Sequence, residues 1–545
     1  MSILGTRFGS CRASLIVAAV GAILAGSGSL CRAEGLPAKT LVFCSDASPA
    51  GFDPAQYTTS VEYSAAAYTV YNRLVEFRRG GTEVEPGLAQ SWDISPNGLV
   101  YTFHLRHGVK FQTTSFFTPA RMFNADDVVL TFERMLDKDN PLRRAYPAQF
   151  PYFASLDLDK NIASIDRLDP YTVRITLKSV SAPFLSELAM PFASVISAEY
   201  ASRLMAAGKA SDLNQLPVGT GPFIFRHYTK DNSIRFDGNP DYWKPGTVRL
   251  NKLVFDITPD PAVRMQKLRA GECQMMNYPR PADIKSLQGD PTLRVSHQAG
   301  FNLAYLGYNT THPPLDNVEV RRALDMAINK KAIIESVYEG AGQAAANPMP
   351  PTQWSYNAAL KDAAYSPAKA KERLAKAGFP NGFDISLWAM SVQRPYNPNA
   401  RLMAEMIQAD WAKIGVRAKI VSYEWGEYVR RGHAGEHDAI LTGFTGDNGD
   451  PDNWLRVLLG CSSLKGGNYA KWCYKPFDDL IVQAQQITDV SKRMRLYMRA
   501  QEIFKDQVPF TPIAYSNVYQ PMRQNVVGFE IDPFGPTQFW NVGLK

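Results

Sequence analysis

Histidine and cysteine are scarce in this sequence, and both shortages limit the chemistry open to it. The 545 residues include seven histidines and six cysteines, and no two cysteines have the C-x-x-C spacing of a structural zinc site. The motifs G-x-S-x-G, G-x-x-x-x-G-K-[ST] and H-E-x-x-H, which mark serine hydrolases, phosphate-binding loops and zinc peptidases, are also missing. We therefore expect no catalytic residue, no metal centre and no cofactor.

Long apolar runs are missing everywhere except at the N-terminus. Arg7 and Arg12 come first, the apolar stretch 13–25 follows, and small residues lead to Ala33, which is the order of a secretory signal peptide. Thirteen apolar residues fall short of the roughly 20 that a membrane-spanning helix needs. Cys31 raises a lipoprotein alternative, but Gly-Ser-Leu before it matches lipidation signals poorly. We predict a cleaved signal peptide, residues 1–33, and an exported, soluble product.

Dense clusters of basic residues are also missing. Removal of residues 1–33 takes away three arginines and no acid, so the formal net charge falls from +7 to +4. A chain with this mild charge and no Lys/Arg stripe lacks the electrostatic signature of a nucleic-acid-binding protein. We expect no nucleic-acid partner.

Four cysteines remain after removal of the signal peptide: Cys44, Cys273, Cys461 and Cys473. An even number in an exported chain suggests two disulfides. The natural local pair is Cys461 with Cys473, whereas a bond between Cys44 and Cys273 would join segments that are distant in the sequence.

Alternating strands and helices predict an α/β protein. Residues 91–95 and 99–105 flank an Asn-Gly turn and predict a hairpin, and 125–135 begins with two acids that suit a helix N-terminus. Apolar residues at helical spacing predict helices over 318–338 and 399–414, and the second is followed by a strand at 417–421. No low-complexity linker separates these regions, which favours lobes joined by short hinge strands.

Two polar motifs compete as candidate sites. His433-Ala-Gly-Glu436-His437 matches the H-x-x-E-H pattern of a zinc hydrolase, but Gly432 and Gly435 weaken the helix that this chemistry needs, so a polar connection is favoured. The acidic run from Asp447 to Asn453 lacks the spacing of an EF-hand calcium loop. It follows an apolar strand, however, where α/β folds place ligand contacts.

Several longer blocks resemble a known family. They are Glu83-Val-Glu-Pro-Gly-Leu-Ala-Gln-Ser-Trp92, Asn124-Ala-Asp-Asp-Val-Val129, Val218-Gly-Thr-Gly-Pro-Phe223, Asn239-Pro-Asp-Tyr-Trp243 and Val318-Glu-Val-Arg-Arg-Ala-Leu324. With them the chain resembles, nearly from end to end, the extracellular solute-binding proteins for peptides and nickel. The strings Gln393-Arg-Pro-Tyr-Asn-Pro-Asn-Ala-Arg401 and Gly446-Asp-Asn-Gly-Asp-Pro-Asp-Asn453 are similar to those of its dipeptide-binding members.

This resemblance implies a two-lobed periplasmic-binding-protein fold of the α/β class, a hinged clamshell that closes over its ligand. Lobe I would comprise residues 39–299, with an inserted subdomain at about 72–218, and would be completed by 518–545. Lobe II would comprise 300–517. The resemblance also implies the disulfides Cys44–Cys273 and Cys461–Cys473.

The resemblance further implies how a dipeptide is bound. Asp447 would pair with the ligand's α-ammonium, and Arg394 would hold its α-carboxylate with two parallel hydrogen bonds. Backbone groups of Thr445 and Gly446 would bond the ligand main chain, and Tyr396 would form a wall. The spacing of the two charges would then select dipeptides, because the carboxylate of a tripeptide would overshoot Arg394.

The implied partners are a dipeptide and the permease subunits of an ABC-type importer at the inner membrane, with the receptor a periplasmic monomer. Within the receptor class, haem, δ-aminolevulinate, longer peptides and a nickel chelate remain alternative ligands. Outside this class, the alternatives are an exported zinc hydrolase using His433, Glu436 and His437, and a chaperone-like or sensory protein that would not need Asp447.

Overall fold

The computed structural model describes residues 39–545, which belong to one compact unit. The predicted signal peptide, with Cys11 and Cys31, lies outside the described residues. No helix from residue 39 onward combines the length and the apolar character needed to cross a bilayer.

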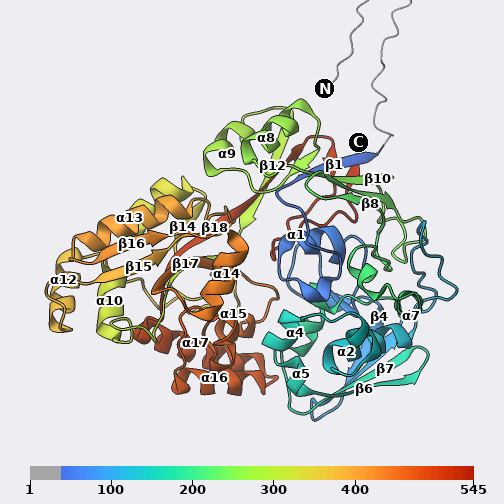
Figure 1. Cartoon of the computed structure of the whole chain (residues 1–545), viewed down its shortest axis with the longest axis horizontal. Coiled ribbons are helices and arrows are strands. Elements are labelled where there is room, and N and C mark those ends of the chain that lie inside the picture. Colours follow the sequence, from blue (N-terminus) through green and yellow to red (C-terminus); the bar gives the residue numbers. More distant parts are fainter. Residues whose placement is uncertain (1–38) are drawn as a thin grey trace, which may run out of the picture. The chain divides into compact units, whose positions relative to one another are not determined.

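One long strand, β18 (Phe510–Arg523), runs through both halves of a twelve-stranded sheet. Its first half pairs with β13 (Asn302–Tyr308) and β14 (Gly342–Ala344), and its second half pairs with β11 (Met275–Met276) and β12 (Leu293–Ala299). In Figure 1, β18 passes diagonally from the orange half into the half that contains β1 and β12. The structure is thus a two-lobed α/β fold, as predicted, with lobe I on the side of β1 and lobe II on the side of β17.

Lobe I is built on a mixed sheet in which the order is β11-β1-β10-β9-β8. β1 pairs in parallel with β10 and β11, while β9 pairs antiparallel with β10 and β8. The bounds of its other elements are β1 Thr40–Ser45, β8 Phe223–Thr229, β9 Ser233–Gly238, β10 Lys252–Ile257, α1 Ser60–Glu62, α8 Pro261–Ala270 and α9 Pro281–Gln288.

A separate antiparallel sheet of four strands forms the inserted subdomain, in the order β4-β5-β7-β6. The predicted hairpin is confirmed, with Gly98 at φ 71° in the turn between β4 and β5. The predicted helix is α2, and its Asn124 and Asp127 form a reciprocal capping box. The bounds are β2 Val75–Phe77, β3 Val84–Pro86, β4 Ala89–Ile94, β5 Val100–Leu105, β6 Ile162–Asp169, β7 Thr172–Leu177, α2 Ala125–Leu136, α3 Pro141–Ala145, α4 Pro151–Ser155, α5 Leu158–Asn161, α6 Phe184–Leu188 and α7 Ala198–Ala206.

Lobe II is built on β16-β15-β17-β13, with β15 parallel to both of its neighbours. The helix predicted at 399–414 is α13, and the strand that follows is β16. Its other elements are α10 Val318–Met326, α11 Lys330–Ile333, α12 Pro367–Lys376, α13 Ala400–Ala412, α14 Trp425–Ala434, α15 Asp452–Leu459, α16 Lys475–Gln485, α17 Val490–Gln507, β15 Asp384–Trp388, β16 Arg417–Val421 and β17 Ala439–Thr445.

The single helix predicted over 318–338 is wrong in one respect, because the chain breaks it between α10 and α11. Asn329 starts a new helix by accepting a hydrogen bond from the Ala332 amide, and its own amide donates to Asp410 at 2.8 Å. A carboxylate 81 residues away therefore stabilises the interruption.

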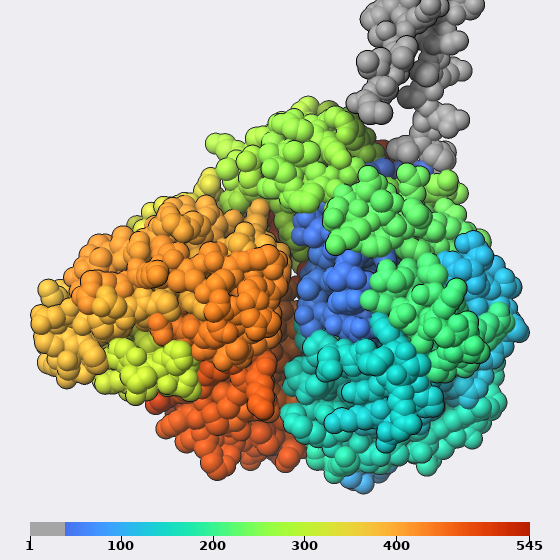
Figure 2. All heavy atoms as spheres, viewed as in Figure 1, coloured from blue at the N-terminus to red at the C-terminus, as the bar shows by residue number. Residues whose placement is uncertain are grey.

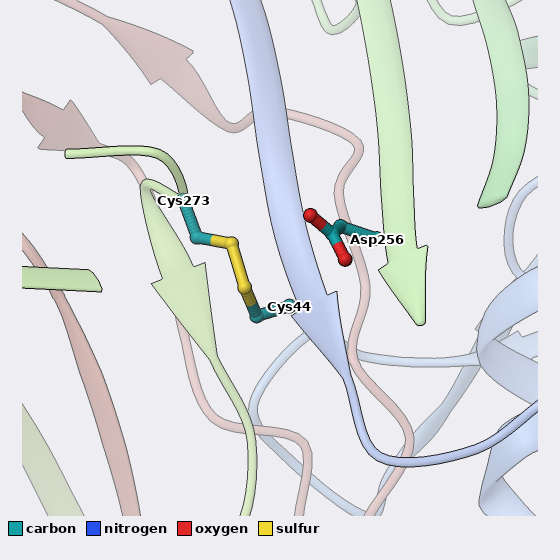
Figure 3. Close-up of side chains that lie close together, drawn as sticks. All are labelled: Cys44, Asp256 and Cys273. Atoms are coloured by element: carbon teal, nitrogen blue, oxygen red, sulfur yellow. A yellow bond between two sulfur atoms is a disulfide. The ribbon is translucent and has the colours of Figure 1, made fainter. Parts of the chain in front are cut away.

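Both predicted disulfides are present. Cys44 of β1 is bonded to Cys273, just before β11, and Figure 3 shows Asp256 beside them on β10. Cys461 is bonded to Cys473 across a short loop after α15. Each bond ties together segments within one lobe.

Candidate functional site

Two neighbouring parallel strands of lobe II carry the predicted charged residues on the loops that follow them. β15 and β17 pair in parallel, with Trp388 opposite Ile440. Arg394 follows β15 and Asp447 follows β17. Because the carboxyl ends of parallel strands meet at one edge of a sheet, both side chains belong to that edge, where α/β folds bind ligands.

Arg394 is a partly exposed cation that has no acidic partner within the described residues. Its guanidinium lies over the ring of Trp425, 4.6 Å from the centroid, and Nη1 donates to the carbonyl of Gln393 at 3.1 Å. Reciprocal backbone bonds with Asn397, of 3.1 and 3.0 Å, fix the loop. A held, unpaired guanidinium is suited to bind a carboxylate.

A narrow hollow adjoins Arg394 at the place where the chain crosses between the lobes. Residues of lobe I, lobe II and the crossing strand β18 all line it. They are Tyr278, Pro279, Pro281, Ile284, Tyr338, Ala341, Gln393, Arg394, Pro395, Pro398, Ser516, Asn517, Val518 and Tyr519. Asp447 is not among them, so the hollow reaches the predicted carboxylate anchor and not the predicted ammonium anchor.

Tyr278 of this hollow was not anticipated from the sequence. Its backbone has a φ of 45°, a conformation that is uncommon for a residue with a large side chain. The buried guanidinium of Arg264 holds this turn by donating to the carbonyls of Asn277 and Tyr278 at 3.2 Å each. No local motif predicts this pairing, because the donor, Arg264, lies on the preceding helix α8 and the acceptors are backbone carbonyls.

Asp447 is a buried carboxylic acid with no basic partner among the described residues. Its Oδ2 is buried and has no hydrogen-bond partner in the described structure, while its amide donates to Asn453 at 2.9 Å. Burial raises the pKa of Asp447 to about 7, and polar contacts with Tyr152 and Asn453 offset part of that rise. A buried carboxylate of this kind would be stabilised by an incoming cation.

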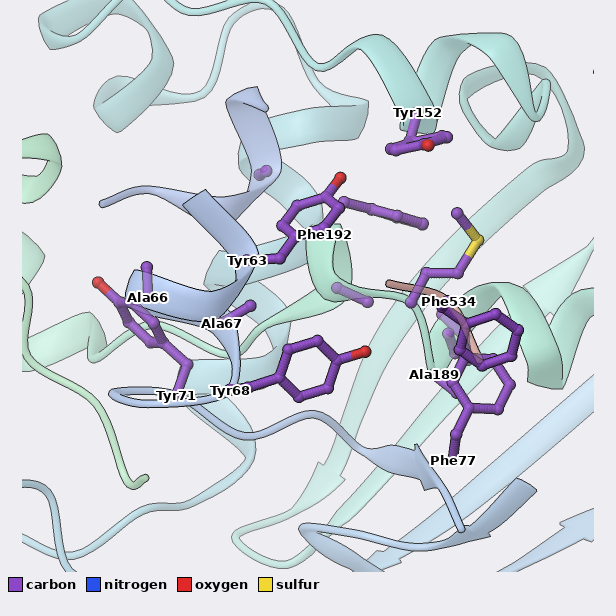
Figure 4. Close-up of a cluster of buried hydrophobic side chains, with 14 of the residues drawn as sticks. Tyr63, Ala66, Ala67, Tyr68, Tyr71, Phe77, Tyr152, Ala189, Phe192 and Phe534 are labelled. Atoms are coloured by element: carbon purple, nitrogen blue, oxygen red, sulfur yellow. The ribbon is translucent and has the colours of Figure 1, made fainter. Parts of the chain in front are cut away.

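The environment of Asp447 is aromatic and comes from lobe I. Figure 4 shows Tyr63 and Tyr68 on one turn of the chain, with Tyr152 of α4 in the same cluster. Burial raises the pKa of all three phenols, and the Asp447 carboxylate raises each further. The phenols therefore stay neutral. The Tyr63 hydroxyl donates to the carbonyl of Tyr57 at 2.6 Å, and Tyr152 is the phenol that contacts the acid.

The remaining predicted residues lie at the end of β17. The ring of Tyr396 packs against Gly443, where an added Cβ would lie 2.1 Å from Tyr396 Cδ2. Thr445 lies near Gly535 of lobe I, and the Gly446 amide donates to the carbonyl of Phe301 at 2.9 Å. The Gly446 N–H is thus already used within the protein.

The alternative zinc motif is not assembled. The polar loop predicted to begin at His433 is wrong for this residue, because His433 lies on α14. Gly432 packs against Tyr469 within the helix, which ends at Gly435. His437 bonds the Tyr469 carbonyl at 2.8 Å, burial lowers its pKa to about 4, and Glu436 pairs with Arg431. From residue 39 on, the one cluster with metal-ligand spacing is Cys44, Asp256 and Cys273, whose thiols form a disulfide.

Comparisons with known proteins agree on one family. Residues 83–466 match the model of the bacterial extracellular solute-binding proteins, family 5. The di/tripeptide-binding protein 1 of Pseudomonas aeruginosa (strain UCBPP-PA14) is 61% identical over 93% of this chain and 94% of its own. A dipeptide-binding protein of P. aeruginosa PAO1 is 60% identical over 93% and 95%.

A solved structure is also similar over its whole length. The dipeptide-binding protein from Pseudoalteromonas sp. SM9913, in complex with Met-Leu, superposes with a TM-score of 0.87. It is 40% identical, and the match covers 93% of this chain and 100% of that one.

Proposed function

Because the chain belongs to family 5 of the bacterial extracellular solute-binding proteins, which bind solutes rather than catalyse reactions, we propose that it captures dipeptides between its two lobes. The observation that supports this most directly is the unbalanced carboxylate of Asp447 and the unpaired guanidinium of Arg394 at one edge of the lobe II sheet. The names of the relatives, a di/tripeptide-binding protein and a dipeptide-binding protein, point to short peptides.

The chemistry of a dipeptide explains why one acid and one base suffice. A free dipeptide is a zwitterion, and burial of either terminal charge without a partner would be strongly unfavourable. Asp447 would pair with the ammonium and Arg394 with the carboxylate. Thr445 and Gly446 would contribute backbone carbonyls, and Tyr396 a wall beside Arg394.

The hinge would lie where the chain crosses between the lobes. We place residues 39–299 and 518–545 in lobe I, with the insertion at about 72–218, and 300–517 in lobe II. Two observations support this division: β12 continues directly into β13 through Gly300, and the Gly300 amide bonds the Ser516 carbonyl of β18 at 2.9 Å. Two adjacent crossings of this kind would permit a rigid-body rotation.

The proposed setting is the periplasm, reached through the signal peptide of residues 1–33. The closed, liganded monomer would deliver the dipeptide to the permease subunits of an ABC-type importer. Closure fixes the orientation of the two lobes, and the permease would recognise that orientation. The family model and the relatives' names support a receptor outside the cytoplasmic membrane.

Calorimetry on protein freed of bound ligand by partial unfolding tests the proposal. We expect Gly-Leu to bind, free Leu not to bind, and Gly-Leu-Gly to bind more weakly, because both anchors are needed at one spacing. Equal affinity for the dipeptide and the tripeptide would contradict the length selection. If haem, δ-aminolevulinate or a nickel chelate binds and Gly-Leu does not, the assignment of a peptide ligand is rejected.

A further inference from the structure

The loop that carries Asp447 leads directly into a helix that touches the other lobe. α15 begins at Asp452, and its Arg456 reaches the inserted subdomain of lobe I. Figure 2 shows the orange-red helices of this region against the cyan subdomain. The ligand loop and a contact between the lobes therefore share one short segment.

Arg456 makes a buried polar contact across the interface. Its Nη2 lies 2.9 Å from Oε1 of Glu187 on α6, and its Nη1 donates to the carbonyl of Leu156 at 3.0 Å. Within lobe II its Nε donates to Asp452 at 2.7 Å. The side chains of Arg456 and Glu187 are only 7% and 1% exposed, so water screens this pair very little.

A second contact lies beside the first. The Ala182 amide, just before α6, donates to the carbonyl of Gln485 on α16 at 2.7 Å. The side chain of Gln485 in turn donates to Asp452 at 3.1 Å. One network of hydrogen bonds thus joins the α4 and α6 regions of lobe I to α15 and α16 of lobe II.

Within the described residues of lobe I alone, the Glu187 carboxylate would not be stabilised by a basic residue. Glu187 has no basic partner from its own lobe among the described residues, and its Oε2 is buried without a hydrogen bond. Rotation about the hinge would separate it from Arg456 and expose both groups to water. The energy of the pair is therefore gained or lost only as the lobes close and open.

We propose that Arg456 and Glu187 form a latch that holds the two lobes closed and thereby strengthens the binding of every ligand alike, without contacting the ligand. Both are positioning residues for the function proposed above. Because the latch acts on the closed state, its strength enters the affinity as a common factor for all ligands.

The charge balance of the network makes the latch sensitive to pH. Burial raises the pKa of Glu187 to about 8, Arg456 opposes the rise, and Asp452 and Asp450 add to it. The charged and titratable groups that act on Glu187 are Arg456, Asp452, Asp450 and Tyr101. Beyond them, Asp157 lies 3.8 Å from Arg456 and Arg493 pairs with Asp450. Three buried acids thus share two buried arginines, and Glu187 is the one that takes up a proton, so below about pH 8 the contact is a hydrogen bond from Arg456 to a neutral Glu187.

The sign of the effect follows from the direction of this shift. In the open form a hydrated Glu187 would titrate near its ordinary value of 4.5. Closure then takes up a proton between that value and about 8, so the latch favours closure most at low pH. This contribution is lost as the pH rises through about 8.

Glu187→Ala in the full mature chain is the first test. We expect the affinity for Gly-Leu and for a second dipeptide to fall by the same factor, on the order of tenfold to a hundredfold. Small-angle scattering should show a larger radius of gyration for the ligand-free variant than for the ligand-free wild type. Unchanged affinity together with an unchanged radius would overturn the latch.

Two further variants separate a latch from a loss of stability. Asp53→Ala removes an equally buried acid from Arg134 inside lobe I, so it should lower Tm and leave the affinity unchanged. Glu187→Gln mimics the protonated acid, so the ratio of its affinity to that of the wild type should rise on the order of fiftyfold to a hundredfold from pH 6 to pH 8.5. Asp447 titrates in both proteins and cancels in this ratio, and a flat ratio would count against the latch.

The scattering measurement needs no ligand, so it distinguishes the two proposals. If no dipeptide binds but the Glu187→Ala variant is more open than the wild type, the latch stands and the ligand assignment fails. If dipeptides bind and the variant is neither weaker nor more open, the reverse holds.

Discussion

Replacement of Asp447 by alanine should reduce dipeptide affinity by at least a hundredfold while leaving the ligand-free protein as stable as the wild type. Loss of one partner of a buried charge pair costs about 2–5 kcal/mol, much of it from the ligand ammonium left without a partner. Stability is spared because the carboxylate Oδ2 of Asp447 has no hydrogen-bond partner among the described residues. Calorimetry with Gly-Leu and a thermal unfolding curve measure the two effects.

The matched control is Asp438, at the other end of the same strand. Asp438 bonds Ser386 at 2.7 Å and His312 at 2.9 Å, so Asp438→Ala should lower Tm and leave the affinity unchanged. Asp447→Asn keeps the volume of the side chain and removes its charge, and it should lose nearly as much affinity as Asp447→Ala. Dipeptide binding at wild-type strength in either Asp447 variant would reject the ammonium anchor.

Local pattern was enough to predict elements whose cause is local. The hairpin around Asn97 and Gly98 follows from turn chemistry, α2 from the two acids at its N-terminus, and α13 from apolar spacing. The break after α10 was missed because its cause is not local: Asp410, on another helix, accepts the amide of Asn329. Apolar periodicity continues through such a break, so it cannot reveal one.

The residues of the candidate site also fall into those that the sequence predicted and those that it did not. Asp447 and Arg394 lie in strings that resemble one family, and the parallel pairing of β15 with β17 brings their loops to one edge. Tyr63 and Tyr152 come close to Asp447 from lobe I, roughly 300 to 400 residues earlier in the sequence, and carry no motif of their own. Such contacts follow from how the two lobes meet, which no short pattern encodes.

The helix at His433 illustrates how packing overrides propensity. Two glycines within four residues favour a connection there, at a cost of about 1 kcal/mol for each glycine in a helix. Gly432 is nevertheless helical, and a Cβ at that position would lie 2.8 Å from the ring of Tyr469. The glycine is needed for a close approach between elements, and the sequence around it cannot show this.

Arg394 should be intolerant even of lysine. A guanidinium binds a carboxylate with two parallel hydrogen bonds and stacks on Trp425, whereas an ammonium is a point charge that can do neither in the same way. We expect Arg394→Lys to weaken Gly-Leu binding about tenfold and Arg394→Ala about a hundredfold or more, as measured by calorimetry. Arg417→Ala, which removes an exposed arginine paired with Asp384 at the opposite end of the β15–β16 pair, should change nothing.

The amide of the dipeptide shows whether Arg394 acts through the ligand carboxylate. Gly-Leu amide keeps the ammonium for Asp447 and lacks the terminal charge, so the wild type should bind it much more weakly than Gly-Leu. Arg394→Ala should bind the two ligands with similar affinity, because the group that distinguishes them is gone. If the variant still prefers Gly-Leu by the wild-type factor, the carboxylate is held elsewhere, and the hollow beside Arg394 serves another part of the ligand.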